Sequence, residues 1–367
     1  MQTEKICGAF GVELFAQKDI KKGIINSTKL ITDRRGNQYI LQEINNNVFK
    51  NIEKLMQNIA SVSEYIHKMH KKSRKNIDTL QLLKTNTNAY YLVEKDENNK
   101  PHYFRMYKYI ANANTYDEGN EQLLYAAGIG FGNFQKSLQN FPAKTLNETI
   151  YNFHNTPYRY KKLLAAVEKA KTTNPERYKK AQPAIKFAVQ NSNIAPTITN
   201  ALKNKALPIR VVHNDTKLNN VVLSNRKNKP VAVIDLDTVM PGSLLYDYGD
   251  AIRFCANTTS EDETNVKLID VDMKKLKAFT SGFLKETHAI LTENEFAIMP
   301  YAPKVLAYEL GIRFLTDYLA GDKYFKVNSS RPDHNLERAT AQFTLTQKFK
   351  QYENDIQQII SEEYKKY

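Results

Sequence analysis

Apolar and polar residues alternate along much of the first 110 positions, which is the pattern of half-buried β-strands. Two such segments, residues 24–32 and 39–45, flank the turn sequence of residues 34–37 and predict a β-hairpin. A second hairpin is expected from residues 89–94 and 103–110, which a polar turn joins. Between the hairpins, apolar residues at spacings of three and four predict one amphipathic helix: Val48, Ile52, Leu55, Ile59, Val62 and Ile66.

Helical spacing dominates the chain from about Asp117 onward. Further helical patterns follow Ser260, and three long ones precede it: residues 121–138, 158–170 and 175–192. One strand-rich stretch interrupts the helices at residues 208–238 and holds three apolar strands: residues 209–212, 221–223 and 231–234. The pattern predicts an α+β fold, in which a small lobe of sheet and helix (residues 1–108) precedes a larger, mainly helical lobe (residues 109–367).

Length and composition agree with two globular lobes, because 367 residues are many for one ordinary domain. Charged residues interrupt the first twenty positions, which argues against a secretory signal. No apolar run reaches the roughly 18 residues that a membrane span needs. Only two cysteines are present, Cys7 and Cys255, too few for a disulfide scaffold or a structural zinc site. We therefore expect a cytoplasmic protein.

The formal net charge of +14 raises the question of nucleic acid binding. The densest basic cluster lies directly after the predicted amphipathic helix, where a solvated helix end explains it: Lys68, Lys71, Lys72, Arg74 and Lys75. Nucleic acid is therefore not the expected partner. A phosphate-rich ligand such as ATP also suits a basic protein, but one site accounts for only part of the excess charge.

The candidate chemistry lies where two apolar strands of residues 208–238 end. Residues 213–220 follow one strand, and residues 234–237 end another. Asp215 can accept a proton from a hydroxyl group, and Lys217 can reach a γ-phosphate. Asn220 and Asp235 offer the oxygen ligands that a magnesium ion prefers. Lysine two residues and asparagine five residues after the aspartate is the spacing of protein kinases. The competing interpretation is a polar hairpin with capped turns.

This stretch resembles the catalytic loop of the aminoglycoside phosphotransferase and choline kinase superfamily, which implies a protein-kinase-like fold. The resemblance is closer to the N-acetylhexosamine 1-kinases. It rests on His213, Asp215, Asp235, Asp237, Thr238, Pro241, Gly242 and residues 246–250, and it extends to residues 131–135, 153–157 and 309–319. The resemblance implies that the chain moves the γ-phosphate of ATP to the anomeric hydroxyl of a sugar.

The resemblance also implies roles for individual residues. Asp215 would be the catalytic base, and Asn220 and Asp235 would hold magnesium. Asp237 would either be a second metal ligand or support the other ligands. Asp247 and Asp250 are expected to cap the N-terminus of a helix.

For the acceptor, the resemblance points to Arg313 and Tyr324 as sugar contacts and to Phe254 as part of the pocket wall. One alternative for Arg313 stays open, because Glu309, Arg313 and Asp317 are spaced four apart and would form an ion-pair ladder on a helix. His154 lies in a polar loop, where a surface position is the usual outcome, and it receives no role.

The nucleotide side departs from the protein-kinase pattern. Gln42 occupies the strand position at which a lysine is expected, so the lysine–glutamate ion pair cannot form there. The preceding loop has a single glycine, Gly23, although Asn26 and Thr28 can offer donors to phosphates. We expect ATP to bind near Gly23, Asn26, Thr28, Gln42 and Tyr107, with Mg²⁺ as cofactor.

Two other functions remain open at this point. The first is a kinase with a different small acceptor: an aminoglycoside, a choline-like amine or another sugar. The second is a regulator that binds nucleotide or RNA without turnover. The complete set of Asp215, Lys217, Asn220 and Asp235 argues against a regulator.

Overall fold

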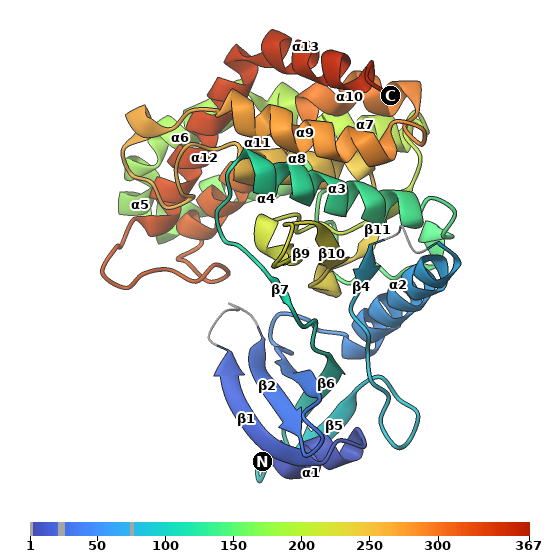
Figure 1. Ribbon diagram of the computed structural model, residues 1–367. Coiled ribbons are helices and arrows are strands. Elements are labelled where there is room, and N and C mark those ends of the chain that lie inside the picture. Colours follow the sequence, from blue (N-terminus) through green and yellow to red (C-terminus); the bar gives the residue numbers. More distant parts are fainter. Residues whose placement is uncertain (1–2, 21–25, 74–76) are drawn as a thin grey trace.

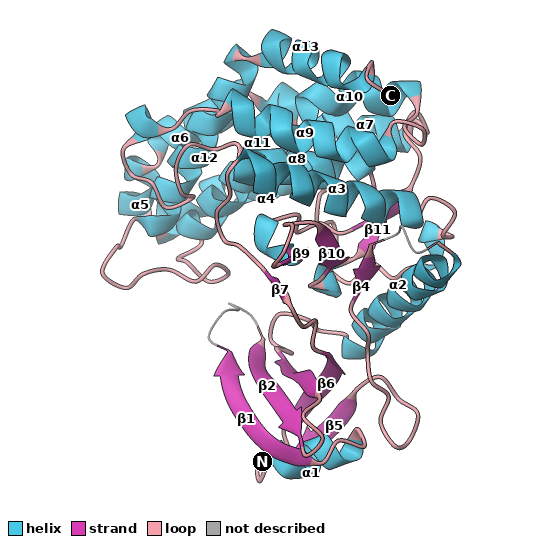
Figure 2. Cartoon of the chain, viewed as in Figure 1, coloured by secondary structure: helices cyan, strands magenta, loops and turns pink. Residues whose placement is uncertain are grey.

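The computed structural model describes residues 3–20, 26–73 and 77–367 and confirms the α+β fold. An antiparallel sheet forms the N-terminal end of the molecule, and a thick assembly of helices forms the rest (Figures 1 and 2). The sheet has the strand order β1-β2-β3-β6-β5. Its strands are β1 (Leu14–Ile20), β2 (Ser27–Asp33), β3 (Gln38–Ile44), β5 (Leu92–Lys95) and β6 (Pro101–Lys108).

Both predicted hairpins are present. In the first, β2 pairs with β3, and Asp33 holds the turn between them: its Oδ1 accepts from the backbone N–H groups of Arg35 and Asn37. In the second, β5 and β6 pair around the equivalent Asp96. The sequence analysis did not anticipate β1, and the beginning of its first predicted strand, residues 24 and 25, lies outside the described residues.

The sheet has two different faces. On one face, α1 (Thr3–Ala9) packs through Ile6 and Cys7 onto Leu41, Phe104 and Met106. Since side chains alternate along a strand, Arg105 and Tyr107 of β6 point to the opposite face. That second face is turned toward the rest of the molecule, and Tyr107 belongs to the main apolar core there.

The predicted amphipathic helix is α2 (Ile52–Lys72). It begins four residues later than the first apolar position, Val48, because the Asn51 side chain accepts from the N–H of Lys54 and caps the helix. The buried Asn58 of α2 donates to the carbonyl oxygens of Asn147 and Val239. These bonds join α2 to the C-terminal part of the chain.

Two small sheets lie between the N-terminal sheet and the helices. One has the order β4-β10-β9-β7 and the other pairs β11 with β8. Their strands are β4 (Asp78–Thr79), β7 (Ala113–Asn114), β8 (Arg210–Val212), β9 (Val221–Ser224), β10 (Pro230–Val233) and β11 (Met240–Gly242). The chain visits the second sheet at β4, returns to the first sheet for β5 and β6, and leaves it between Lys108 and Ala113. A division into lobes at residues 108 and 109 remains our proposal.

Helices make up the rest of the chain. They are α3 (Glu121–Ser137), α4 (Thr156–Thr173), α5 (Pro175–Lys180), α6 (Gln182–Gln190), α7 (Pro196–Lys203), α8 (Leu244–Cys255), α9 (Met273–Thr287), α10 (Glu293–Ile298), α11 (Ala302–Leu319), α12 (His334–Gln351) and α13 (Glu353–Tyr364). The pattern predicted over residues 175–192 is divided into α5 and α6, and Pro183 lies in the first turn of α6. Within the described ranges, no helix is long and apolar enough to cross a membrane.

Two glycines bring α3 and α9 into close contact. A Cβ atom on Gly128 would lie 2.2 Å from the carbonyl oxygen of Phe279, and one on Gly282 would lie 2.1 Å from that of Tyr125. The backbones therefore meet where neither helix can carry a side chain. This contact holds α9 against α3, the helix that lies over β9 and β10 (Figure 1).

We expect Gly128→Ala to destabilise the protein by about 1–3 kcal/mol, because the added methyl group must push the two backbones apart. Chemical denaturation measures the change. Gly8→Ala is the control, since a Cβ atom there meets nothing within 4 Å and alanine favours the helix α1. Equal stability of Gly128→Ala and the wild type would contradict the close packing.

Candidate active site

The loop of residues 213–220 brings Asp215, Lys217 and Asn220 together. Lys217 Nζ lies 3.0 Å from Asp215 Oδ1, and Asn220 Nδ2 donates to Asp215 Oδ2 at 3.1 Å and to the Asp215 carbonyl oxygen at 2.8 Å. A short 3₁₀ turn, Leu218–Asn220, leads directly into β9 and sets this spacing. The Asp215 side chain keeps 29% of its surface exposed, so a hydroxyl group can reach it.

Asp235 follows β10 and faces the same region. Its φ of +60° is left-handed, a conformation that few non-glycine residues adopt. The next-door Ile234 donates its N–H to the carbonyl oxygen of Asn220 at 2.9 Å, which fixes the two strand ends side by side. Loss of hydration and the charges of Asp237 and Asp215 raise the pKa of Asp235 to about 7.

This carboxylate cluster suits a divalent cation. Negative charges crowd around Asp235, and a bound cation would relieve their repulsion. Asp235 remains exposed on one side. The hydrogen bonds described for Asn220 use its Nδ2, so its Oδ1 can face a cation together with the Asp235 carboxylate. Carboxylate and amide oxygens are ligands of Mg²⁺. Among the described residues, no group of three or more His, Cys, Asp or Glu side chains forms a metal site by itself.

Asp237 has partners from the N-terminal sheet. Its Oδ1 lies 2.5 Å from Arg105 Nη1, and its Oδ2 accepts from Asn26 Nδ2 at 2.7 Å. Asn26 in turn accepts from the N–H of Asn45. Asp237 is buried, so its charge is balanced by the guanidinium group and not by water. In this structure Asp237 connects the two parts of the molecule.

Gln42 is engaged by residues on both neighbouring strands. Its Oε1 accepts from Arg105 Nε at 3.0 Å and Nη2 at 2.7 Å, and its Nε2 donates to Thr28 Oγ1 at 3.0 Å. The sequence analysis missed Arg105. The alternating pattern of β6 contained the signal, because a charged residue stands between buried apolar positions, Phe104 and Met106.

Two other residues were expected at the nucleotide. Tyr107 is buried, and Gly23 lies outside the described residues.

Asp247 and Asp250 do not cap α8, and that prediction is wrong. Ser243 is the N-cap residue, because its side chain accepts from the N–H of Leu245. Asp247 accepts instead from the backbone N–H groups of His213 and Asn214. Asp250 pairs with Arg253 at 2.8 Å. Burial opposes its ionisation, but Arg253 and Lys217 hold the pKa of Asp250 below its ordinary value.

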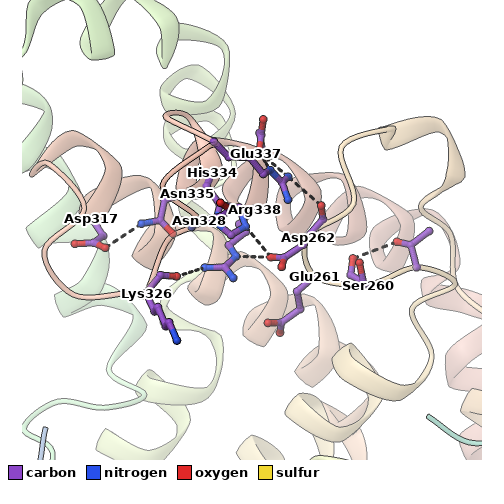
Figure 3. A network of polar contacts seen from close by, with 12 residues as sticks. Ser260, Glu261, Asp262, Asp317, Lys326, Asn328, His334, Asn335, Glu337 and Arg338 are labelled. Carbon is purple, nitrogen blue, oxygen red and sulfur yellow. Dashed lines mark hydrogen bonds and ion pairs between the residues drawn. The ribbon is translucent and has the colours of Figure 1, made fainter. Parts of the chain in front are cut away.

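A loop after α8 brings another acid to Arg253. Glu261 Oε1 lies 2.5 Å from Arg253 Nη1, so Arg253 pairs with both Glu261 and Asp250. The charges of these two acids also act on Lys217. The loop is held from behind by α12, where Asp262 accepts from Arg338 at 2.5 Å and lies 3.1 Å from His334 Nε2 (Figure 3).

Arg313 does not form the ion-pair ladder. Glu309 lies 2.7 Å from His154 Nδ1 and accepts from the Thr156 hydroxyl group. Asp317 accepts from the backbone N–H groups after α11, at Lys323, Tyr324 and Phe325. Within the part of the chain that the structure describes, no ion pair within 4 Å joins Arg313 to either acid.

The guanidinium group of Arg313 lies instead near two aromatic rings, 5.1 Å from the centroid of Phe153 and 5.5 Å from that of Phe325. Tyr324 is 63% exposed, with its ring edge-on to Phe325. Phe254 is partly exposed and follows Arg253 in α8. The surface position expected for His154 is wrong, because this residue is buried and stacks on Tyr246.

An antiparallel N-terminal sheet that faces a loop with Asp, Lys and Asn in this order is the arrangement of a two-lobed kinase. The sequence model of the phosphotransferase enzyme family matches residues 16–268. The chain therefore belongs to this family and is a phosphotransferase of the kinase type.

Solved structures share the fold over nearly the whole chain. A microcompartment-associated aminopropanol kinase is 12% identical with a TM-score of 0.63, over 97% of this chain and 98% of the other. An aminoglycoside phosphotransferase from Alicyclobacillus acidocaldarius is 10% identical with a TM-score of 0.57, over 99% and 97%. An amicoumacin kinase in complex with AMP-PNP, Ca²⁺ and Ami is 14% identical with a TM-score of 0.53, over 94% and 88%.

We expect the apparent affinity for Mg²⁺ in the presence of nucleotide to fall as the pH drops from 8 to 6. A carboxyl group with a pKa near 7 is ionised at pH 8 and protonated at pH 6, and only the ionised form binds a cation. The loss approaches tenfold per pH unit below 7. Mg²⁺ titrations monitored by nucleotide binding at several pH values measure it, with Asp235→Asn as the comparison because the nucleotide phosphate itself titrates at about pH 6. Equal pH dependence in the wild type and Asp235→Asn would contradict the raised pKa of Asp235.

Proposed function

We propose that the chain transfers the γ-phosphate of ATP to the anomeric hydroxyl group of an N-acetylhexosamine, GlcNAc or GalNAc, and releases the sugar 1-phosphate. Asp215 accepts the proton of the attacking hydroxyl group. Lys217, which lies against Asp215, stabilises charge on the transferred phosphoryl group. Most of the catalysis comes from positioning and charge stabilisation.

On the nucleotide side, we propose that ATP binds beneath the N-terminal sheet, along Gly23, Asn26, Thr28, Gln42 and Tyr107. Asn220 and Asp235 hold Mg²⁺. Asp237 is either a further metal ligand or a residue that supports the other ligands. The metal would neutralise phosphate charge during transfer. A related kinase of the same fold was solved with AMP-PNP and Ca²⁺, which supports a nucleotide and a divalent cation here.

The pairing of the acids near Asp215 carries the choice of a neutral acceptor. Asp250 and Glu261 both pair with Arg253, and Asp215 pairs with Lys217. A cationic acceptor needs free acids or an aromatic cage. In contrast, the guanidinium group of Arg313, with its fixed donors, suits the hydroxyl groups of a sugar. The aromatic rings of Phe254 and Tyr324 would pack on the sugar's apolar face.

An amino alcohol or aminoglycoside is the second candidate acceptor. Glu261 favours it, because its side chain keeps 31% of its surface exposed beside Arg253. The relatives whose names specify aminopropanol and aminoglycoside acceptors share the fold with this chain, at 10–12% identity.

Asp215→Asn is expected to fold normally and to lose about 10²–10⁴-fold in turnover, the range of a positioned general base. Thermal melting checks the fold, and ADP release measures turnover. Asp355→Asn, on the exposed surface of α13, is the matched control and should behave as the wild type. Near-wild-type turnover of Asp215→Asn would remove this residue from its role.

A panel of neutral sugars and amino alcohols should show ADP release with N-acetylhexosamines and little with amines. Phosphorus NMR of the product should show an anomeric phosphate, and a 6-phosphate would contradict the proposed site of transfer.

Arg313→Met should raise the KM for the sugar about tenfold or more and leave the KM for ATP unchanged. Arg34→Met, at an exposed surface position, is the control.

A further inference from the structure

We propose that Arg105 is the cation that binds the phosphates of the nucleotide. It would replace the lysine that kinases carry on β3, where this chain has Gln42. The proposal deepens the proposed function and rests on it. It assigns a phosphate-binding role to a residue on a strand that the kinase pattern does not use for this purpose.

Strand register puts Arg105 in the right place. Gln42 and Arg105 are direct partners in the antiparallel pair of β3 and β6. Directly opposed residues point to the same face of a sheet, with Cβ atoms roughly 4.5–5.5 Å apart. A cation on β6 at this position therefore lies beside the one that β3 would supply.

Hydrogen bonds aim the guanidinium group at the metal-binding end of the cleft. Gln42 accepts from Nε and Nη2, and Thr28 accepts from the other end of the same amide, so Gln42 is fixed and positions Arg105. Nη1 then points away from the sheet to Asp237, two residues after the proposed metal ligand Asp235. The charge of Asp235 also acts on Arg105.

In the proposed nucleotide complex, a phosphate oxygen replaces the Asp237 carboxylate as the partner of Arg105 Nη1. Arg105 is 1% exposed, so a phosphate can reach its donors only if the Asp237 carboxylate moves aside. The exchange replaces one oxyanion by another, and a guanidinium group binds phosphate bidentately. It also frees Asp237 for the metal. Without nucleotide, the Asp237 carboxylate stabilises the buried positive charge, which would be costly alone.

The test is nucleotide binding by calorimetry, which needs neither acceptor nor turnover. We expect Arg105→Gln to weaken ATP binding about 10–100-fold, the effect of losing hydrogen bonds to a charged group. Binding of adenosine, which has no phosphate, should change less than about threefold. Lys108→Gln, at an exposed position of the same strand, is the control and should bind both ligands as the wild type.

A double variant moves the cation back to β3. In Gln42→Lys/Arg105→Gln, the charge stands on the other member of the same cross-strand pair, so we expect at least tenfold of the lost ATP affinity to return. If Arg105→Gln cannot be purified, Arg105→Lys keeps the charge without the fork, and ATP should again lose more affinity than adenosine.

Three results would overturn the role of Arg105. They are unchanged ATP binding by the Arg105 variants, an equal loss for ATP and adenosine, which indicates a purely structural ion pair, and no recovery in the double variant. A wild-type chain that binds no ATP would instead reject the proposed kinase function itself.

Discussion

The buried carboxylate of Asp247 fixes the loop of residues 213–220. It accepts from the backbone N–H groups of His213 at 2.9 Å and Asn214 at 2.8 Å, and from Gln135 Nε2 at 2.6 Å. Burial raises the pKa of Asp247, and these bonds and His213 lower it, which offsets part of the cost. The bonds join α8, β8 and α3 at one point. Asn214 can therefore hold its left-handed φ of +65°, and Asp215 follows in a defined direction.

Charge balance across the cleft is the second constraint. Loss of hydration and the carboxylates of Asp237 and Asp215 raise the pKa of Asp235, and two cations, Arg105 and Lys217, oppose this rise. Lys217 comes from the loop of residues 213–220, and Arg105 comes from the N-terminal sheet. A triphosphate with its metal would enter between these cations. The ion pair of Arg105 and Asp237 joins the N-terminal sheet to the end of β10, where Asp235 and Asp237 lie.

The acceptor side follows the same principle. Arg253 neutralises Asp250 and Glu261, and the Asp262 contacts with α12 keep Glu261 in place (Figure 3). Glu309 and Asp317, the possible partners of Arg313 on α11, are satisfied by His154 and by backbone N–H groups, so the guanidinium group of Arg313 lies against aromatic rings instead.

Local patterns in the sequence were enough to predict the two hairpins, the amphipathic helix, and the convergence of Asp215, Lys217, Asn220 and Asp235, because turn residues, helical spacing and strand ends act over a few positions. The tertiary structure alone decided the rest. The partners of Gln42, Asp237 and Asp247 lie 63, 132 and 34 positions away. The alternative of an ion-pair ladder on α11 is wrong because Glu309 and Asp317 have other partners in the folded chain. The packing of strands and helices decides which charged side chains become partners. A local sequence pattern covers only a few positions and cannot predict contacts between residues so far apart in the chain.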